Sequence, residues 1–159
     1  MGVDALRKAF DAIDAAPDRC DVLGPRDEGL VCAAEQELGV RLPPSYRHFV
    51  SRLGVASIGA EEIYGVVRSD FANSGVPDAI WMTLRARTEW GLPEPMVVVY
   101  FDGAESYFVL DGRVHEADDE WPVVVWRPGI STSDEVLEHV ASDFASLLLR
   151  IVEDQLVRP

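Results

Sequence analysis

The spacing of hydrophobic residues predicts three helices in the first third of the chain. The first carries its hydrophobic residues at steps of three and four and ends before Pro17. The second begins at Pro25 and stops at Gly39, and the third follows a Pro-Pro pair and stops at Gly54, so the two should form a hairpin. The residues expected to face the core are Val3, Leu6, Phe10 and Ile13 in the first helix, Leu30, Val31, Ala34 and Leu38 in the second, and Tyr46, Phe49, Val50 and Leu53 in the third.

Beyond residue 58 the pattern changes to short runs of β-branched and aromatic residues, which are typical of strands. The runs Met96 to Phe101 and Tyr107 to Leu110 are joined by a Gly-containing link, so we expect them to be adjacent antiparallel strands. Shorter strands are predicted at Ile63 to Val67 and at Val123 to Trp126.

Three further segments complete the predicted order. Asp111-Gly112 is a dipeptide that type I′ turns favour, because both central residues need positive φ, and it predicts a turn into a strand at Arg113-Val114. The stretch Asp78 to Arg87 fits either a helix or an extended connector. An amphipathic helix closes the chain, with a stripe of Leu137, Val140, Phe144, Leu147, Leu148, Ile151 and Val152. Helices before and after a run of sequential strands indicate an α+β fold.

Length and composition favour a single cytoplasmic domain over residues 1–159. Hydrophobic types make up 48% and charged types 26% of the 159 residues, and no repeat or linker divides them. The longest apolar run has six residues, against the roughly 20 that a membrane-spanning helix needs, and no secretory pattern opens the chain. Cys20 and Cys32 fit a reducing compartment, with Cys32 expected in the core and Cys20 expected as a loop thiol.

The chain is strongly acidic, and its acidic residues are unevenly distributed along the sequence. The formal net charge is −14, which disfavours direct binding to nucleic acid or to an anionic membrane surface. Between Asp102 and Asp143 eleven acidic residues stand against two arginines, interleaved with Trp121 and Trp126. Such a surface can steer and anchor a basic protein partner, although acidic turns around buried tryptophans serve solubility equally well.

Candidate chemistry is sparse. The histidines His48, His115 and His139 are separated along the chain and define no dyad, and no phosphate-binding glycine motif is present. One segment crowds imidazole and carboxylate groups together, namely His115, Glu116, Asp118, Asp119 and Glu120. Its spacing matches neither a zinc helix motif nor an EF-hand loop, so an acidic turn is favoured over a metal site and no cofactor is expected.

The hairpin of helices carries a motif. The series Glu35, Leu38, Gly39, Leu42, Pro43, Tyr46, Phe49, Val50 and Gly54 resembles the E-x-x-L-G-x-x-L-P-x-x-Y-x-x-F-(L/V)-x-x-x-G pattern of the SUKH superfamily, which includes bacterial toxin-immunity proteins and a fungal cell-wall synthesis regulator. Further blocks follow in the family order: Ile63-Tyr64-Gly65, then Asp102-Gly103 with Tyr107 and Asp111, then Ala141 with Phe144 and Leu148.

The resemblance implies an α+β fold with helices packed around a bent, mostly antiparallel sheet. It implies a family-like core over about residues 25–152, with the helix at residues 1–16 as a cap. It also implies binding without catalysis: an immunity protein that neutralises a cognate toxin of a polymorphic or contact-dependent system, many of which are nucleases. A basic toxin surface would complement the acidic chain.

Charge, and not a family motif, selects the candidate contact residues. They are Glu61, Glu62, Tyr64 and Asp70 around the predicted Ile63 strand, and Glu116, Asp118, Asp119, Glu120 and Trp121 in the acidic segment. Two alternatives stay open, a regulatory or scaffold module like the fungal relative and a small hydrolase that uses the acidic segment.

Overall fold

The computed structural model describes residues 2–114 and 118–157, and its α+β fold confirms the predicted class. The described helices are α1 (Gly2–Asp14), α2 (Glu28–Leu38), α3 (Pro44–Leu53), α4 (Ala79–Trp90) and α5 (Phe144–Val152), with a 3-10 turn η1 (Phe71–Asn73) and a terminal π-helix η2 (Glu153–Val157). The described strands are β1 (Cys20–Val22), β2 (Ala56–Ile58), β3 (Glu61–Ile63), β4 (Met96–Phe101), β5 (Tyr107–Asp111), β6 (Val123–Trp126) and β7 (His139–Ala141).

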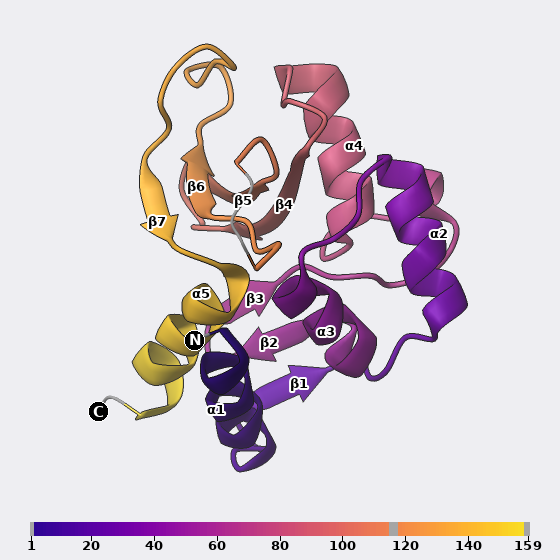
Figure 1. The fold of residues 1–159 in the computed structure, drawn as a ribbon. Coiled ribbons are helices and arrows are strands. Elements are labelled where there is room, and N and C mark those ends of the chain that lie inside the picture. The colour runs from indigo at the N-terminus through magenta and orange to yellow at the C-terminus, as the bar shows by residue number, and fades with distance from the viewer. Residues whose placement is uncertain (1, 115–117, 158–159) are drawn as a thin grey trace.

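The strands form two antiparallel sheets with the orders β1-β2-β3 and β4-β5-β6-β7. The predicted pairing of β4 with β5 is confirmed, with a register shift between Val98 and Tyr100. The shift leaves the Val99 carbonyl free to accept a hydrogen bond from the Tyr64 amide at 2.9 Å. This bond joins the two sheets into one bent, open arrangement (Figure 1).

The ends of α2 follow from local chemistry that the sequence displays. The Asp27 carboxylate accepts a hydrogen bond from the Leu30 amide at 2.7 Å, so it caps the first turn. Gly39 ends the helix at φ 70°, a conformation that glycine adopts without a steric penalty. The predicted second and third helices are therefore confirmed, although α2 begins three residues after Pro25.

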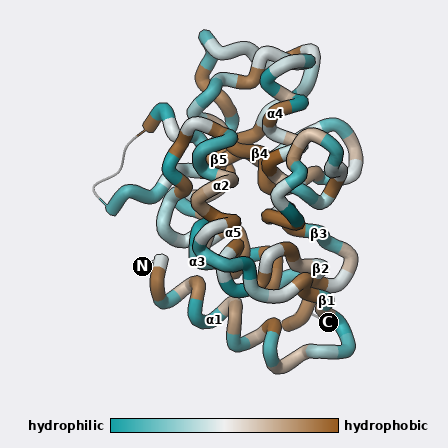
Figure 2. The backbone as a smooth tube through the Cα atoms, turned by 90° about the vertical axis from the view of Figure 1, so that its right-hand side faces the viewer, coloured by the Kyte–Doolittle hydropathy of each residue, from teal (hydrophilic) through white to brown (hydrophobic). Residues whose placement is uncertain are grey.

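α1 and α5 lie side by side and cover the lower sheet together with α3 (Figure 1). The predicted stripe of α1 buries Leu6, Phe10 and Ile13, whereas Val3 is exposed. α4 packs against β4, whose first four residues are fully covered. Figure 2 shows the resulting hydrophobic interior along β4. One cluster of buried residues includes side chains from α1, α2, α3, α4 and α5 and from both sheets. The single domain over residues 1–159 stays a prediction.

The segment Asp78 to Arg87, which fitted a helix or a connector, is helical. The buried Asp78 carboxylate caps α4 by accepting hydrogen bonds from the Ile80 and Trp81 amides. The predicted strand at Ile63 to Val67 is displaced, because β3 spans Glu61–Ile63 and shares only Ile63 with the predicted range. None of the described helices has both the length and the apolar character needed to cross a bilayer.

A turn follows Asp111 as predicted, closed by a hydrogen bond from the Val114 amide to the Asp111 carbonyl at 3.4 Å, but it is not of type I′, because neither Asp111 nor Gly112 has positive φ. The predicted strand at Arg113-Val114 is wrong, and β5 pairs with β6. Glycine is needed at 112 for space, since an added Cβ would lie 2.4 Å from the Pro95 carbonyl oxygen.

Two further predictions need correction. Leu137 and Val140 are not on the closing helix, because β7 pairs with β6 and the Asp143 carboxylate starts α5 by accepting a hydrogen bond from Ser146 N–H at 2.8 Å. Cys20 lies in β1 and not in a loop, and Cys32 is only half-buried on α2.

Candidate functional site

The acidic segment after residue 117, which the sequence suggested as one contact cluster, is divided between two cavities. Asp118 and Glu120 line a cavity of about 1000 Å³, here called the acidic cavity. Asp119 and Trp121 line a second cavity of about 610 Å³ that also contains Arg41 and Arg47. Alternate residues therefore face different sides. Asp119 lies at φ 64°, where an L-residue is uncommon.

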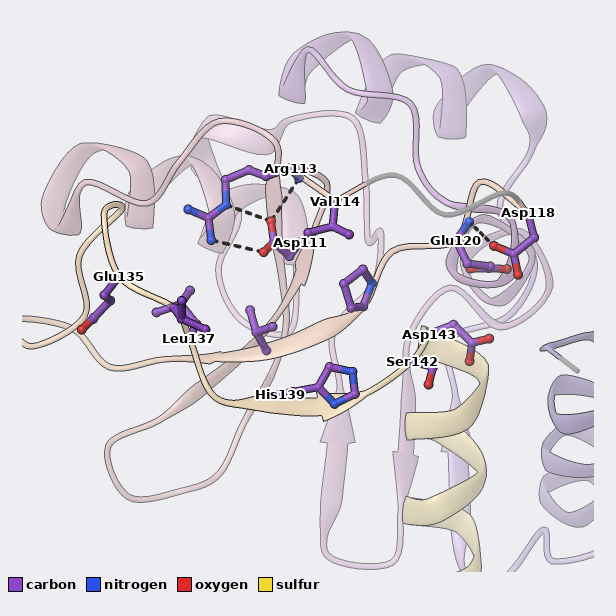
Figure 3. Close-up of a pocket in the computed structure, with 13 residues that line it drawn as sticks. Asp111, Arg113, Val114, Asp118, Glu120, Glu135, Leu137, His139, Ser142 and Asp143 are labelled. Carbon is purple, nitrogen blue, oxygen red and sulfur yellow. Dashed lines mark hydrogen bonds and ion pairs between the residues drawn. The ribbon is translucent and has the colours of Figure 1, made fainter.

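The acidic cavity lies between the β5–β6 connection, the loop before β7 and the start of α5 (Figure 3). Its lining combines apolar groups with carboxylates and two basic side chains. The described residues that line it are Asp111, Arg113, Val114, Asp118, Glu120, Pro122, Val124, Glu135, Val136, Leu137, His139, Ser142 and Asp143.

Glu120 is 7% exposed. It lies in the β5–β6 connection, but its side chain caps the first turn of α3. Its carboxylate accepts hydrogen bonds from the Ser45 amide at 3.0 Å and from the Ser45 hydroxyl at 2.8 Å. Ser45 is in the first turn of α3, where the N-cap residue Pro43 makes no side-chain capping bond, so Glu120 supplies the acceptor that this turn lacks. Burial, opposed by the bonds from Ser45, raises the pKa of Glu120, and the nearby Asp143 and Asp118 charges raise it further.

Asp143 connects the cavity to the start of α5. One carboxylate oxygen accepts the Ser146 amide hydrogen bond that caps the helix. The other lies close to Gly2, since a Cβ built on that glycine would be 3.1 Å from Asp143 Oδ2 and 3.8 Å from Glu120 Oε2. The two acidic side chains therefore lie near each other behind the first turn of α1.

The remaining charged groups of the cavity are more fully satisfied. Asp111 is buried and forms an ion pair with Arg113, whose Nε lies 3.0 Å from Asp111 Oδ1. Arg113 also donates to the Ser133 carbonyl at 3.0 Å. Glu135 accepts a hydrogen bond from the Thr132 amide at 2.8 Å, and His139 is exposed on β7.

The second predicted group lies around β3. Glu62 and Asp70 are exposed, and Asp70 accepts hydrogen bonds from the Asn73 side chain at 3.1 and 3.2 Å. Glu61 is half-buried and accepts a hydrogen bond from the Tyr100 hydroxyl. Tyr64 is buried, which raises the pKa of its hydroxyl to about 12, and its carbonyl accepts a 2.8 Å bond from Tyr46.

The structure does not bring the two predicted groups together. Within residues 2–114 and 118–157, no hydrogen bond, ion pair or shared cavity connects the β3 group with the acidic segment. Glu116 lies outside the described residues. Glu120 and Trp121 are buried, so in the folded chain their side chains support neighbouring exposed residues such as Asp118 and Asp119.

The sequence did not single out Asp143 and His139 as site residues. Asp143 carried a usable signal, since an Asp directly before a hydrophobic helical stripe is a typical N-cap. His139 carried none, because only the pairing of β7 with β6 places it beside Val124 in the cavity.

Among the residues that the structure describes, no three His, Cys, Asp or Glu side chains converge as a metal-ion site would require. Carboxylates around an apolar floor can bind a cation that carries a hydrophobic stem.

Antiparallel sheets covered by an N-terminal helix, a helical hairpin and a closing helix, with an acidic cavity beside the last strand, define an α+β domain of the type that the motif predicted. The family model SUKH_5, described as SMI1-KNR4 cell-wall, matches residues 6–153. The chain therefore belongs to this family, and the resemblance seen in the sequence is confirmed. The match includes most of α1. No curated protein matches the chain.

Proposed function

We propose that this protein is a non-catalytic cytoplasmic immunity protein that neutralises a cognate bacterial toxin of a polymorphic or contact-dependent system. The observation that carries the proposal is membership of the SUKH family, whose members are commonly immunity proteins. The net charge of −14 adds a physical reason, because a toxin that acts on nucleic acid needs a cationic groove, and an acidic protein can associate with it rapidly and cover it.

The contact surface would consist of exposed carboxylates held by a rigid framework. Glu62 and Asp70 present charge beside β3, and Asp118 and Asp119 present charge in the β5–β6 connection. Both groups are proposed contacts, and a toxin would contact one of them or both. Direct contacts with nucleic acid or a membrane are not part of the proposal, since the same charges repel both.

The experiment is co-expression of the chain with the product of the neighbouring large gene, followed by pull-down and a growth assay. We expect a stoichiometric complex and restored growth, while an unrelated acidic protein of similar size gives neither. A neighbouring toxin that kills cells equally well with and without the chain, and that does not bind it, would overturn the proposal.

The alternative is a regulatory or scaffold module, which the family description itself favours by naming the cell wall. Such a module would bind several cellular proteins with modest affinity and would lie among housekeeping genes. Deletion of the gene separates the two: altered cell-wall sensitivity in the absence of any toxin supports the module, and sensitivity only to a toxin-producing neighbour supports immunity.

A further inference from the structure

The two sheets leave two strand edges open. The strand orders are β1-β2-β3 and β4-β5-β6-β7, and the bond from the Tyr64 amide to the Val99 carbonyl joins the sheets on the β4 side. Among the described residues, β1 and β7 therefore each pair with one neighbouring strand only. An open edge presents backbone N–H and C=O groups with which a further strand can pair.

The edge of β7 is uncovered. Figure 1 shows β7 at the outer margin of the upper sheet. Pairing with β6 extends one residue beyond the strand, since the Glu138 carbonyl accepts a hydrogen bond from the Val125 amide at 2.9 Å. Within the described residues the backbone of β7 bonds to β6 and to no other element. The backbone groups on its far edge are therefore available to a partner.

The sequence around this edge does not oppose strand addition. Residues 137–142 contain no proline and no lysine, the residues that commonly protect an open edge. The loop before β7 exposes two large apolar side chains, Val136 at 100% and Ile130 at 67%. Because β7 has only three residues, backbone bonds alone would bind weakly, and side chains beside the edge must contribute to affinity and specificity.

The charge beside the edge selects a basic occupant. Residues 130–142 carry three acidic side chains, Asp134, Glu135 and Glu138, and no lysine or arginine. All three are exposed, and only Glu138 is in an ion pair with a described residue, at 3.4 Å from Arg127. Such an exposed pair contributes little, so the field at the edge is negative. A strand with basic side chains complements it.

The same charge disfavours other occupants. Two copies of this chain paired through β7 would bring identical acidic segments together, and like charges on neighbouring strands are destabilising. The β1 edge is less selective, because Arg19 directly precedes that strand and sits between Asp18 and Asp21 in the sequence.

We propose that the outer edge of β7 accepts a strand from the protein partner, an extended segment in which arginine or lysine alternates with apolar residues. Its backbone would pair with Glu138 to Ala141, its basic side chains would lie near the three acidic residues, and an apolar side chain would contact Val136. The proposal rests on the immunity function and deepens it, since it names the structural element that the toxin must supply.

The test uses the capped peptide acetyl-Arg-Val-Lys-Val-Arg-Val-amide, titrated into the ¹⁵N-labelled full chain and followed by NMR. The same peptide with every residue amide N-methylated keeps the charges and side chains but loses the backbone donors. We expect the first peptide to shift the amides of Glu138 to Ala141 saturably and to slow their hydrogen exchange, and the methylated peptide to do neither. Absence of these effects, equal effects of both peptides, or equal shifts in β1 would overturn the proposal.

Matched variants make the assignment specific. Glu138→Lys reverses a charge beside the edge and should weaken the peptide about fivefold, whereas Glu37→Lys makes the same change on exposed α2 and should have less than about a twofold effect. Val136→Ala should weaken the peptide about threefold, and Val3→Ala, on exposed α1 surface, should leave affinity unchanged. Equal weakening within either pair would show attraction without an edge site and overturn the proposal.

Failure of this inference is distinguishable from failure of the proposed function. If the neighbouring gene product binds the wild-type chain and the Val136→Ala/Glu138→Lys double variant equally tightly, the immunity function stands and strand addition at β7 is wrong. If the toxin does not bind but the unmethylated peptide protects the β7 amides, the edge site stands and the partner is another protein.

Discussion

At the residue scale, Glu120 links the acidic cavity to the stability of α3. Its raised pKa means that the folded chain holds the Glu120 proton more tightly than the unfolded chain does. The stability that Glu120 contributes is therefore fully present below the usual pKa of 4.5 and is lost as pH rises through the raised value. We predict that Glu120→Gln gains stability relative to wild type as pH rises from below 4.5 to neutral, because its amide oxygen can accept the Ser45 amide hydrogen and its NH₂ group can donate to the Ser45 hydroxyl without a charge.

Urea unfolding of both proteins across this pH range measures the effect. Glu120→Ala is the control, because it removes the charge and also the acceptor for the Ser45 amide, so it should be less stable than Glu120→Gln by about 1–2 kcal/mol at every pH. Parallel pH curves for wild type and Glu120→Gln would contradict the assignment of a raised pKa.

A second residue-scale prediction concerns Gly65 in the Ile-Tyr-Gly block. A Cβ at this position would lie 1.6 Å from the Gly54 carbonyl oxygen, which accepts the Val66 amide hydrogen bond. The two backbones cannot separate without losing that bond, so we expect Gly65→Ala to destabilise the chain by about 2–3 kcal/mol. Gly75→Ala is the matched control, because a Cβ there meets no atom within 4 Å, and thermal unfolding should detect no more than about 0.5 kcal/mol.

The sequence predicted some of these residues and could not predict others, for physical reasons. Asp118 to Trp121 were placed in one contact group because they are adjacent in sequence. Their division between two cavities depends on the backbone path after β5, where Gly112 packs against the Pro95 carbonyl. The cap that Glu120 gives to Ser45 joins residues 75 positions apart, which no local pattern encodes.

At the scale of elements, the question is whether the N-terminal helix α1 is a removable cap or part of the hydrophobic core. Phe10 is fully buried between α5 and α3, stacks edge-on with His48 at 5.3 Å and lies under the Arg52 guanidinium at 4.6 Å. We predict that Phe10→Ala costs about 3–5 kcal/mol and lowers one cooperative unfolding transition. Lys8→Ala, on the exposed face of the same helix, should cost less than about 0.5 kcal/mol.

Calorimetry of the two variants decides the question. A Phe10→Ala protein that shows a separate low-temperature transition with the main transition unshifted would identify α1 as an independent cap.

Elements whose signals are local were predicted well, and elements defined by pairing were not. The stripes of α1 and α3 and the caps of α2 specify those helices within a few residues of sequence. Arg113-Val114 resembled a strand only because it followed an Asp-Gly pair, yet the Asp111 carboxylate accepts the Arg113 amide hydrogen and keeps this segment in a turn. Val140 belonged to a hydrophobic stripe, yet pairing with β6 placed it in β7.

At the scale of the whole molecule, the net charge of −14 predicts how the chain meets its partner. Most of the acidic contact candidates are exposed, so their field acts through solvent and is screened over about 10 Å at 0.1 M salt. We predict that the association rate with the cognate toxin falls at least tenfold between about 10 mM and about 150 mM salt, while the dissociation rate changes little. Stopped-flow or surface-based kinetics at several salt concentrations measure both rates.

The two proposed contact groups can be separated by the same kinetics. Glu62→Gln/Asp70→Asn and Asp118→Asn/Asp119→Asn each remove two exposed charges, so their effects on the overall charge are equal. A field that acts only through net charge would slow association equally in both variants, whereas a specific encounter face would slow it mainly in one. Because only the second variant removes a carboxylate that lines the acidic cavity, loss of a toxin contact made there would also raise the dissociation rate of that variant. An association rate that does not respond to salt would remove the electrostatic argument and leave the family relationship as the support for an immunity role.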